Sequence, residues 1–116
     1  MQRQGRLDEA VARYTRAIDL DPTLAQAYSN RGSTYLNLGE PEKAIADLDE
    51  ALTLNPNLAV AYSSRGLAHT NLSNFSQALK DLNEAVRINP NFADAYSTRG
   101  FAHRSAGQLN RAIRDF

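Results

Sequence analysis

Small and apolar residues recur along this chain at the spacing of an α-helix, in runs separated by turn residues. From Tyr28, the residues Gly32 and Tyr35 follow at steps of four and three, which places them on one stripe of a helix. The run at 44–54 keeps the same periodicity, and no stretch alternates like a β-strand. The pattern predicts helices at about 7–20, 25–38, 41–54, 59–72, 75–88, 93–106 and 109–116.

Turn chemistry lies between the predicted helices. Gly39 and Gly107 can each end a helix in the left-handed conformation, and Ser73 occupies the equivalent position between them. Prolines that stop the preceding helix follow an Asp or Asn three times, at Pro22, Pro56 and Pro90. Candidate N-cap residues come just after these prolines: Thr23, Asn57 and Asn91. The helices should therefore be connected by tight turns.

The whole pattern has a period of 34 residues. The octapeptide Ala-Gln-Ala-Tyr-Ser-Asn-Arg-Gly at 25–32 returns in closely similar form at 59–66 and 93–100. Repetition at this period is typical of stacked helix pairs that bury their apolar faces against neighbouring pairs. We expect one array over 1–116, divided into a partial repeat at 1–24, full repeats at 25–58 and 59–92, and a truncated repeat at 93–116.

An array with these boundaries begins and ends inside a repeat, as expected for a piece of a longer array or a deliberately trimmed chain. Stacked repeats normally need polar terminal helices. Apolar residues of the terminal helices should then be unusually exposed: Val11, Tyr14, Ile18, Ile113 and Phe116. Head-to-tail stacking or helix exchange between copies would cover them.

The aromatic, small and proline columns resemble those of the tetratricopeptide repeat. The matching residues in the best-formed unit are Tyr28, Gly32, Tyr35, Ala44, Leu48, Ala51 and Pro56. This resemblance implies an all-α fold, a right-handed superhelical solenoid of antiparallel helix hairpins. The chain departs from the family pattern where leucine is preferred, at Arg31, Arg65 and Arg99, and where tyrosine is preferred, at His69 and His103.

In the family resembled, the first helix of each unit lines a concave binding face. The positions that this implies here are Gln26, Ser29, Asn30, Ser33, Asn37, Val60, Ser63, Ser64, Leu67, Asn71, Asp94, Ser97, Thr98 and Phe101. Short polar groups of this kind suit hydrogen bonds to a peptide backbone, with Val60, Leu67 and Phe101 as an apolar anchor. The alternative is that small polar residues solvate an unused surface.

Each arginine of the unusual column is followed 16 residues later by an acid: Asp47, Asp81 and Asp115. One interpretation is an Arg–Asp bridge across each hairpin, repeated three times. The other is that each arginine lies along the stack with its head group in solvent. The sequence leaves both open.

Composition excludes several classes of function. Thirteen basic residues balance thirteen acidic ones and are scattered, which disfavours nucleic-acid and membrane partners. There is no cysteine, and no apolar segment long enough for a signal peptide or a membrane span. We therefore expect a soluble, cytoplasmic protein. The helix axes that carry His69 and His103 should be roughly 10 Å or more apart, too far for the two to share one metal. The sequence also has no phosphate-binding glycine loop, no HExxH zinc signature and no base paired with its serines, so we expect no metal, no cofactor and no catalytic residues.

These observations predict a non-enzymatic scaffold that binds a protein or peptide segment on its concave face. Two alternatives are an arm of a multidomain enzyme or regulator and a module that binds copies of itself. One family subtype grips the C-terminal carboxylate of a chaperone with basic and amide side chains. The positions that would hold these carboxylate-binding residues here, as this resemblance implies, are Ser29, Ser33, Ser64, Asp94 and Thr98. None matches, and Asp94 would repel a carboxylate, so chaperone tails are not the expected partner.

Overall fold

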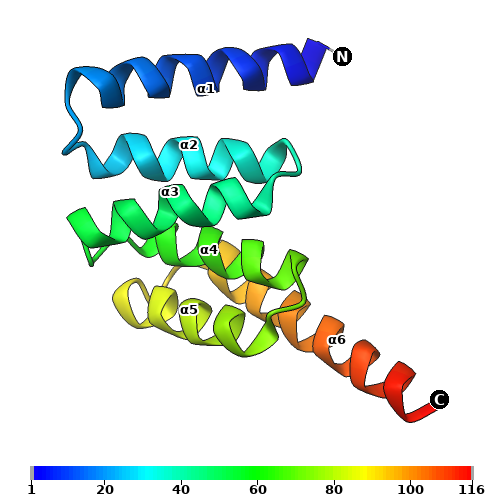
Figure 1. Cartoon of the computed structure of the whole chain (residues 1–116). Helices are drawn as coiled ribbons and strands as arrows, with labels where there is room; N and C mark the ends of the chain where they lie inside the picture. The colour runs from blue at the N-terminus through cyan, green and yellow to red at the C-terminus, as the bar shows by residue number, and fades with distance from the viewer. Residues whose placement is uncertain (1, 116) are drawn as a thin grey trace.

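The fold is built only from helices in the part of the chain that the computed structural model describes, which is residues 2–115 for the backbone and 3–111 for side chains. The helices are α1 (Gln2–Leu20), α2 (Ala25–Asn37), α3 (Pro41–Leu54), α4 (Ala59–Asn71), α5 (Phe75–Ile88) and α6 (Ala93–Asp115). The all-α hairpin architecture expected from the sequence is confirmed (Figure 1).

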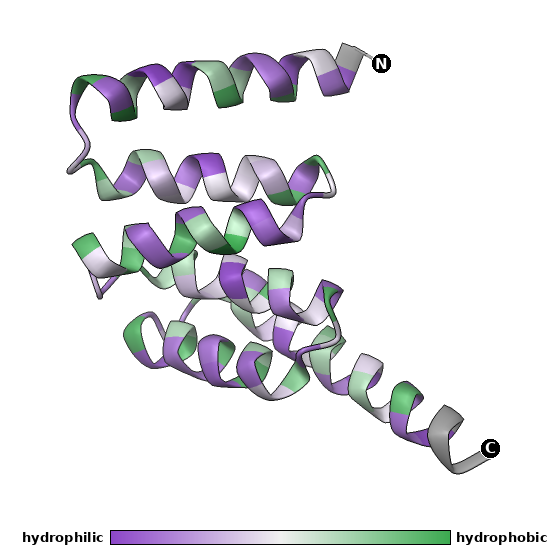
Figure 2. Ribbon diagram, viewed as in Figure 1, coloured by the Kyte–Doolittle hydropathy of each residue, from purple (hydrophilic) through white to green (hydrophobic). Residues whose placement is uncertain are grey.

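Consecutive helices pack against each other along the whole chain, so α2 pairs with α3 and α4 pairs with α5. In addition, α4 contacts both α2 and α6. The helices α2, α4 and α6 therefore form one layer, and α1, α3 and α5 form the other. The result is an elongated body of 51 × 35 × 21 Å. Figure 2 shows polar and apolar residues interspersed along every helix, as expected for helices with one buried stripe.

In each full hairpin, a glycine on the first helix packs against a leucine on the second helix. A Cβ atom added at Gly32 would lie 2.8 Å from Leu48 Cγ, and one added at Gly66 would lie 2.6 Å from Leu82 Cγ. Both leucines have no exposed surface. Several alanines of α3, α4 and α5 are likewise fully buried: Ala44, Ala51, Ala61, Ala78 and Ala85. These small residues allow the helix backbones to approach closely.

The turns differ in part from the prediction. Gly39 and Ser73 have positive φ angles of 75° and 62°, as predicted, and Pro41 begins α3. Thr23 and Asn57 are not N-caps, because the residues that precede α2 and α4 are Leu24 and Leu58, which make no side-chain cap. The backbone N–H groups of Thr23 and Asn57 instead donate hydrogen bonds to the side chain of the residue before the proline.

These hydrogen bonds recur in each connection between hairpins. The amides of Thr23, Asn57 and Asn91 donate to the side-chain oxygens of Asp21, Asn55 and Asn89, respectively, at 3.0–3.2 Å. An Asp or Asn side chain that bonds the amide two residues later forms a local turn of its own. The Asp/Asn–Pro pairs therefore shape the connection, as well as stopping the helix.

The two terminal helices are longer than predicted. The helix α6 runs without interruption through Gly107, so the predicted turn there is wrong, and its C-terminal half extends beyond α5 (Figure 1). The helix α1 begins at Gln2 and passes through Gly5. Ile18 is buried, with 8% of its surface exposed, which also contradicts the prediction. Ile113 and Phe116 lie outside the described side chains. Within residues 2–115, no helix is long and apolar enough to cross a membrane.

We predict that Gly66→Ala lowers the free energy of unfolding by about 1–3 kcal/mol, because the new methyl group would overlap Leu82. Gly107→Ala is the matched control, since nothing lies within 4 Å of its added Cβ, and alanine there should strengthen the helix by up to ~1 kcal/mol. Urea unfolding measures both. Equal stability of the wild type and Gly66→Ala would contradict the close helix contact.

Candidate functional site

A depression with a volume of about 290 Å³ lies between α4 and α6. Its lining from α4 consists of Val60, Ser63, Ser64 and Leu67, and its lining from the start of α6 consists of Phe92, Asp94, Ser97 and Thr98. All of these residues except Phe92 belong to the predicted concave face. The structure therefore brings half of the fourteen predicted residues together in one groove.

The groove combines apolar surface, hydroxyl groups and one carboxylate. Val60 is 48% exposed, and Asp94 and Ser97 are also exposed. Ser64 lies 3.0 Å from the hydroxyl of Ser33 on α2, oxygen to oxygen, so this hydroxyl pair connects two repeats. Ser63 is buried, with 7% exposed, and contributes to the floor of the groove.

Other predicted residues lie outside this groove. Ser29 is only 1% exposed, so its hydroxyl faces the interior and not an open surface. The amide nitrogen of Gln26 donates to Asn30 at 3.0 Å. Asn37 lines a separate depression against the start of α1. Asn71 and Phe101 are exposed but do not line the groove.

Phe92 is the groove residue that the sequence analysis missed. It precedes α6, outside the helix that the repeat pattern assigned to the concave face. A signal was available, because apolar residues recur at this position in every unit, as Leu24 and Leu58. Residues at the entry to a helix can therefore line a groove that the helix itself borders.

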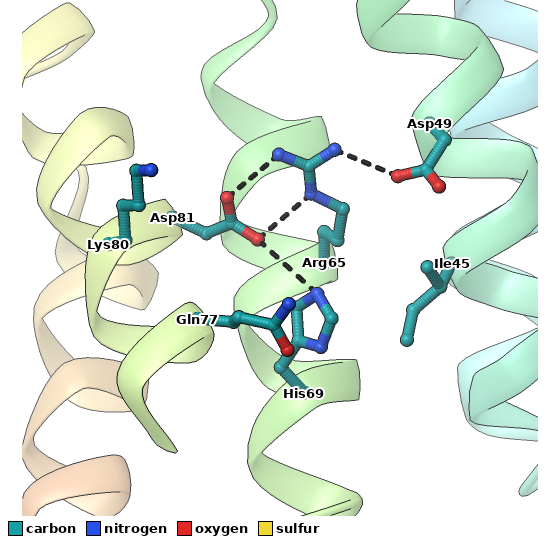
Figure 3. Close-up of a pocket in the computed structure, with 7 residues that line it drawn as sticks. All are labelled: Ile45, Asp49, Arg65, His69, Gln77, Lys80 and Asp81. Atoms are coloured by element: carbon teal, nitrogen blue, oxygen red, sulfur yellow. Dashed lines mark hydrogen bonds and ion pairs between the residues drawn. The ribbon is translucent and has the colours of Figure 1, made fainter. Parts of the chain in front are cut away.

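On the opposite side of α4, Arg65 connects three helices (Figure 3). Its Nε and Nη2 atoms donate to the two carboxylate oxygens of Asp81 on α5, at 2.9 and 2.8 Å. Its Nη1 atom donates to Asp49 on α3 at 2.8 Å. The guanidinium group also lies 5.6 Å from the centre of the Tyr62 ring, within the range of a cation–π contact.

The same arrangement occurs one repeat earlier. Arg31 donates to both oxygens of Asp47 at 2.7 Å, and its Nη1 atom donates to Thr15 at 3.1 Å. The predicted Arg–Asp bridges are thus confirmed for Arg31 and Arg65. The side chain of Asp115 lies outside the described residues, so the third bridge stays a prediction.

Each arginine also has a partner that the sequence analysis missed, 16 residues before it. These partners are Thr15, Asp49 and Asn83, which accept hydrogen bonds from Arg31, Arg65 and Arg99, respectively. The column alternates between hydroxyl, carboxylate and amide groups, all of which accept from a guanidinium. Only one of the three partners is an acid, so a search for acids alone could not reveal this column. Its 34-residue spacing is nevertheless visible in the sequence.

The bridges keep the arginines charged. Hydrogen bonds to Asp81 raise the pKa of Arg65 above its ordinary value, against the opposing effect of burial. The hydrogen bond to Asp47 raises the pKa of Arg31 in the same way. A raised pKa means that this stabilisation is complete below the ordinary arginine value and is lost only as the pH rises beyond it. It is therefore constant across the neutral range.

A larger depression of about 440 Å³ surrounds the Arg65 network, with Ile45, Gln77 and Lys80 at its edges (Figure 3). The two carboxylates in this depression, Asp49 and Asp81, already form ion pairs with Arg65. His69 Nε2 lies 3.9 Å from an Asp81 oxygen, while His103 is exposed. Among the described residues, no group of three or more His, Cys, Asp or Glu side chains could hold a metal ion.

Sequence comparisons agree with the repeat pattern. The tetratricopeptide repeat profile matches residues 25–58 and 59–92, and a related TPR repeat profile matches residues 3–39. The chain belongs to the tetratricopeptide repeat family. A FAM10 family protein of Arabidopsis thaliana is 50% identical to this TPR chain over 38 residues, which are 33% of this chain and only 9% of that protein.

Solved TPR structures are similar over nearly the whole chain. The first TPR of Spaghetti (RPAP3), bound to the HSP90 peptide SRMEEVD, has a TM-score of 0.84 and 31% identity, covering 90% of this chain and 83% of that one. The first TPR domain of human RPAP3 has a TM-score of 0.87 and 30% identity, covering 94% and 86%. The second human RPAP3 TPR domain, in complex with the HSP70 peptide SGPTIEEVD, has a TM-score of 0.80 and 27% identity, covering 87% and 84%.

We predict that Arg65→Ala destabilises the TPR array by about 2–4 kcal/mol, because it leaves the nearly buried Asp81 carboxylate without its partner. Arg65→Lys should cost less, since it keeps the charge but loses the two-pronged contact. Chemical denaturation of single and double variants measures the Arg65–Asp81 coupling. Additivity within ~0.5 kcal/mol would contradict a direct interaction.

The control for this experiment is Arg87→Ala. Arg87 also pairs with an acid, Glu84, but on the exposed surface of α5. Exposed ion pairs contribute little to stability, so this variant should unfold like the wild type.

Proposed function

We propose that this chain is a non-enzymatic binding module that holds a peptide segment of another protein in the groove between α4 and α6. The observation that carries the proposal is the depression lined by Val60, Leu67 and Phe92 together with several hydroxyl groups. Apolar surface with a few polar groups is typical of sites that bind ligands. A volume of about 290 Å³ suits one or two side chains of an extended peptide.

The comparisons support peptide binding in general. Two of the similar TPR structures were solved with peptides, one from HSP90 and one from HSP70. The groove of this chain carries the hydroxyl groups of Ser64, Ser97 and Thr98. Such groups can donate to and accept from a peptide backbone. The proposal extends to partners that are proteins with an accessible, extended segment.

Within this proposal, chaperone tails of the HSP90 and HSP70 type are not the ligand. Those peptides end in Glu-Glu-Val-Asp and are acidic. Asp94 lines the groove here and would repel a carboxylate. None of the groove residues is a lysine or an arginine, so no cation at the site would offset that repulsion.

We predict that Leu67→Glu abolishes capture of peptides selected on the wild-type protein, because a charged side chain would occupy the apolar floor of the groove. Display selection followed by fluorescence polarisation measures this. Leu54→Glu is the control, since Leu54 is 37% exposed and lies outside the groove. Equal loss in both variants, or in neither, would count against the groove as the binding site.

Head-to-tail assembly, the alternative raised by the sequence, has one observation in its favour, because Tyr96 on the open face of α6 is 43% exposed. In the two full repeats, the equivalent face is covered by α3 or α5. However, the α1 helix of a second copy would bring Arg13 to the acid position opposite Arg99, where like charges repel.

We therefore predict that the chain stays monomeric in a light-scattering dilution series. Arg13→Asp restores an acid at that position and should promote association if α1 of one copy reaches α6 of another. Concentration-dependent growth of the wild type would show that the repulsion does not prevent stacking.

A further inference from the structure

We infer that the groove between α4 and α6 selects peptides in which a basic residue lies within about three residues of an aliphatic one. The inference rests on the proposed function and specifies its ligand. Among the described side chains, Asp94 is the only ionisable one that lines this groove. It is exposed, and among the described residues no hydrogen bond or ion pair engages its carboxylate. A lysine, an arginine or a free amino terminus would neutralise it.

The absence of competing cations at the groove strengthens this charge argument. Two arginines of the helices that border the groove have partners elsewhere. Arg65 of α4 is bound to Asp49 and Asp81 on the opposite side of that helix. Arg99 of α6 donates to Asn83 and lies 5.1 Å from the centre of the Tyr96 ring. The groove thus presents a single negative charge among neutral groups. A site that binds acidic ligands would instead carry positive charge.

The repeat register fixes where the charge lies. Asp94 and Val60 occupy equivalent positions in consecutive repeats, 34 residues apart, and both stand in the first turn of their helices. Leu67 follows Val60 by two helical turns, which is about 10 Å along α4. An extended peptide covers this length with about three residues. Because Asp94 lies at the register of Val60, a peptide that pairs with Asp94 and runs along the groove reaches the level of Leu67 after about three residues.

The apolar floor explains the second part of the motif. Val60, Leu67 and Phe92 come from two segments and border one depression. Val60 has 48% of its surface exposed, so covering it with an aliphatic side chain removes apolar surface from water. The Ser64, Ser97 and Thr98 hydroxyls also line the groove and can form hydrogen bonds with the peptide backbone.

A purely structural role for Asp94 predicts a different result. An acid in the first turn of a helix is favoured by the helix dipole, and Glu42 serves as such an acid in α3. If Asp94 does no more than this, replacing it would change stability but not the choice of ligand. Glu42 is exposed and lies outside the groove, so Glu42→Lys is a matched control for a charge reversal at Asp94.

The experiment is a selection from a displayed library of random dodecapeptides on the wild type, Asp94→Lys and Glu42→Lys. The wild type and Glu42→Lys should enrich Lys or Arg within three positions of Leu, Ile, Val or Met. Asp94→Lys should instead enrich Asp or Glu. A selected basic peptide should bind Asp94→Asn about fivefold more weakly at low salt, and this difference should shrink in high salt.

The outcomes separate the two proposals. Selected peptides that are lost on Leu67→Glu but show no basic preference would overturn this inference and leave the peptide-binding function intact. Peptides that bind Leu67→Glu and the wild type equally would overturn the function itself. The HSP70 peptide SGPTIEEVD, which has no basic side chain, and an amidated version with lysine at its three acidic positions are a defined pair of probes. Stronger binding of the acidic member would also refute the inference. Melting of Asp94→Asn shows whether folding is unchanged.

Discussion

The whole arrangement depends on how closely the two helices of a hairpin approach each other. Gly32 and Gly66 have no side chain, and Leu48 and Leu82 fill the space that one would occupy. Because both contacts recur at the same register, the two hairpins have the same geometry and can stack in the same manner. The layer of α2, α4 and α6, and hence the groove, follows from this repeated contact.

The two sides of α4 differ in charge. Arg65 faces α3 and α5, where Asp49 and Asp81 neutralise it. The other side of α4 carries Val60, Ser63, Ser64 and Leu67, none of which is charged. One residue of α6, Asp94, therefore sets the electrostatic character of the groove. The charge balance of the whole chain, which is zero, gives no hint of this local asymmetry.

Periodicity was sufficient to predict most of the fold. The bounds of α3 and α5 match the prediction, and α2 and α4 differ by one residue, because apolar spacing, Gly39 and the prolines all indicate the same boundaries. The Gly107 prediction failed because a glycine permits a left-handed turn without enforcing one. Pro41 follows the Gly39 turn and favours a new helix start, but α5 begins at Phe75 without a proline. Leu109 at the equivalent position therefore does not by itself explain why α6 continues.

The site was predictable only in part, for a related reason. The repeat register identified Val60, Leu67 and Asp94 as groove residues, but it could not show that Ser29 is buried at an equivalent face. Exposure depends on how neighbouring repeats cover each position, and this differs between the middle and the ends of the array. Phe92 was not predicted because it precedes α6, and the repeat pattern was used to assign only residues within helices to the groove.

The two-sided bonding of Arg31 and Arg65 has a consequence for how the array unfolds. Each guanidinium joins its own hairpin to the second helix of the preceding unit, so one hairpin cannot open without breaking a hydrogen bond to its neighbour. In a linear array this adds to the energy of each boundary between folded and unfolded units. The arginine column thus adds a contact at each boundary between neighbouring repeats.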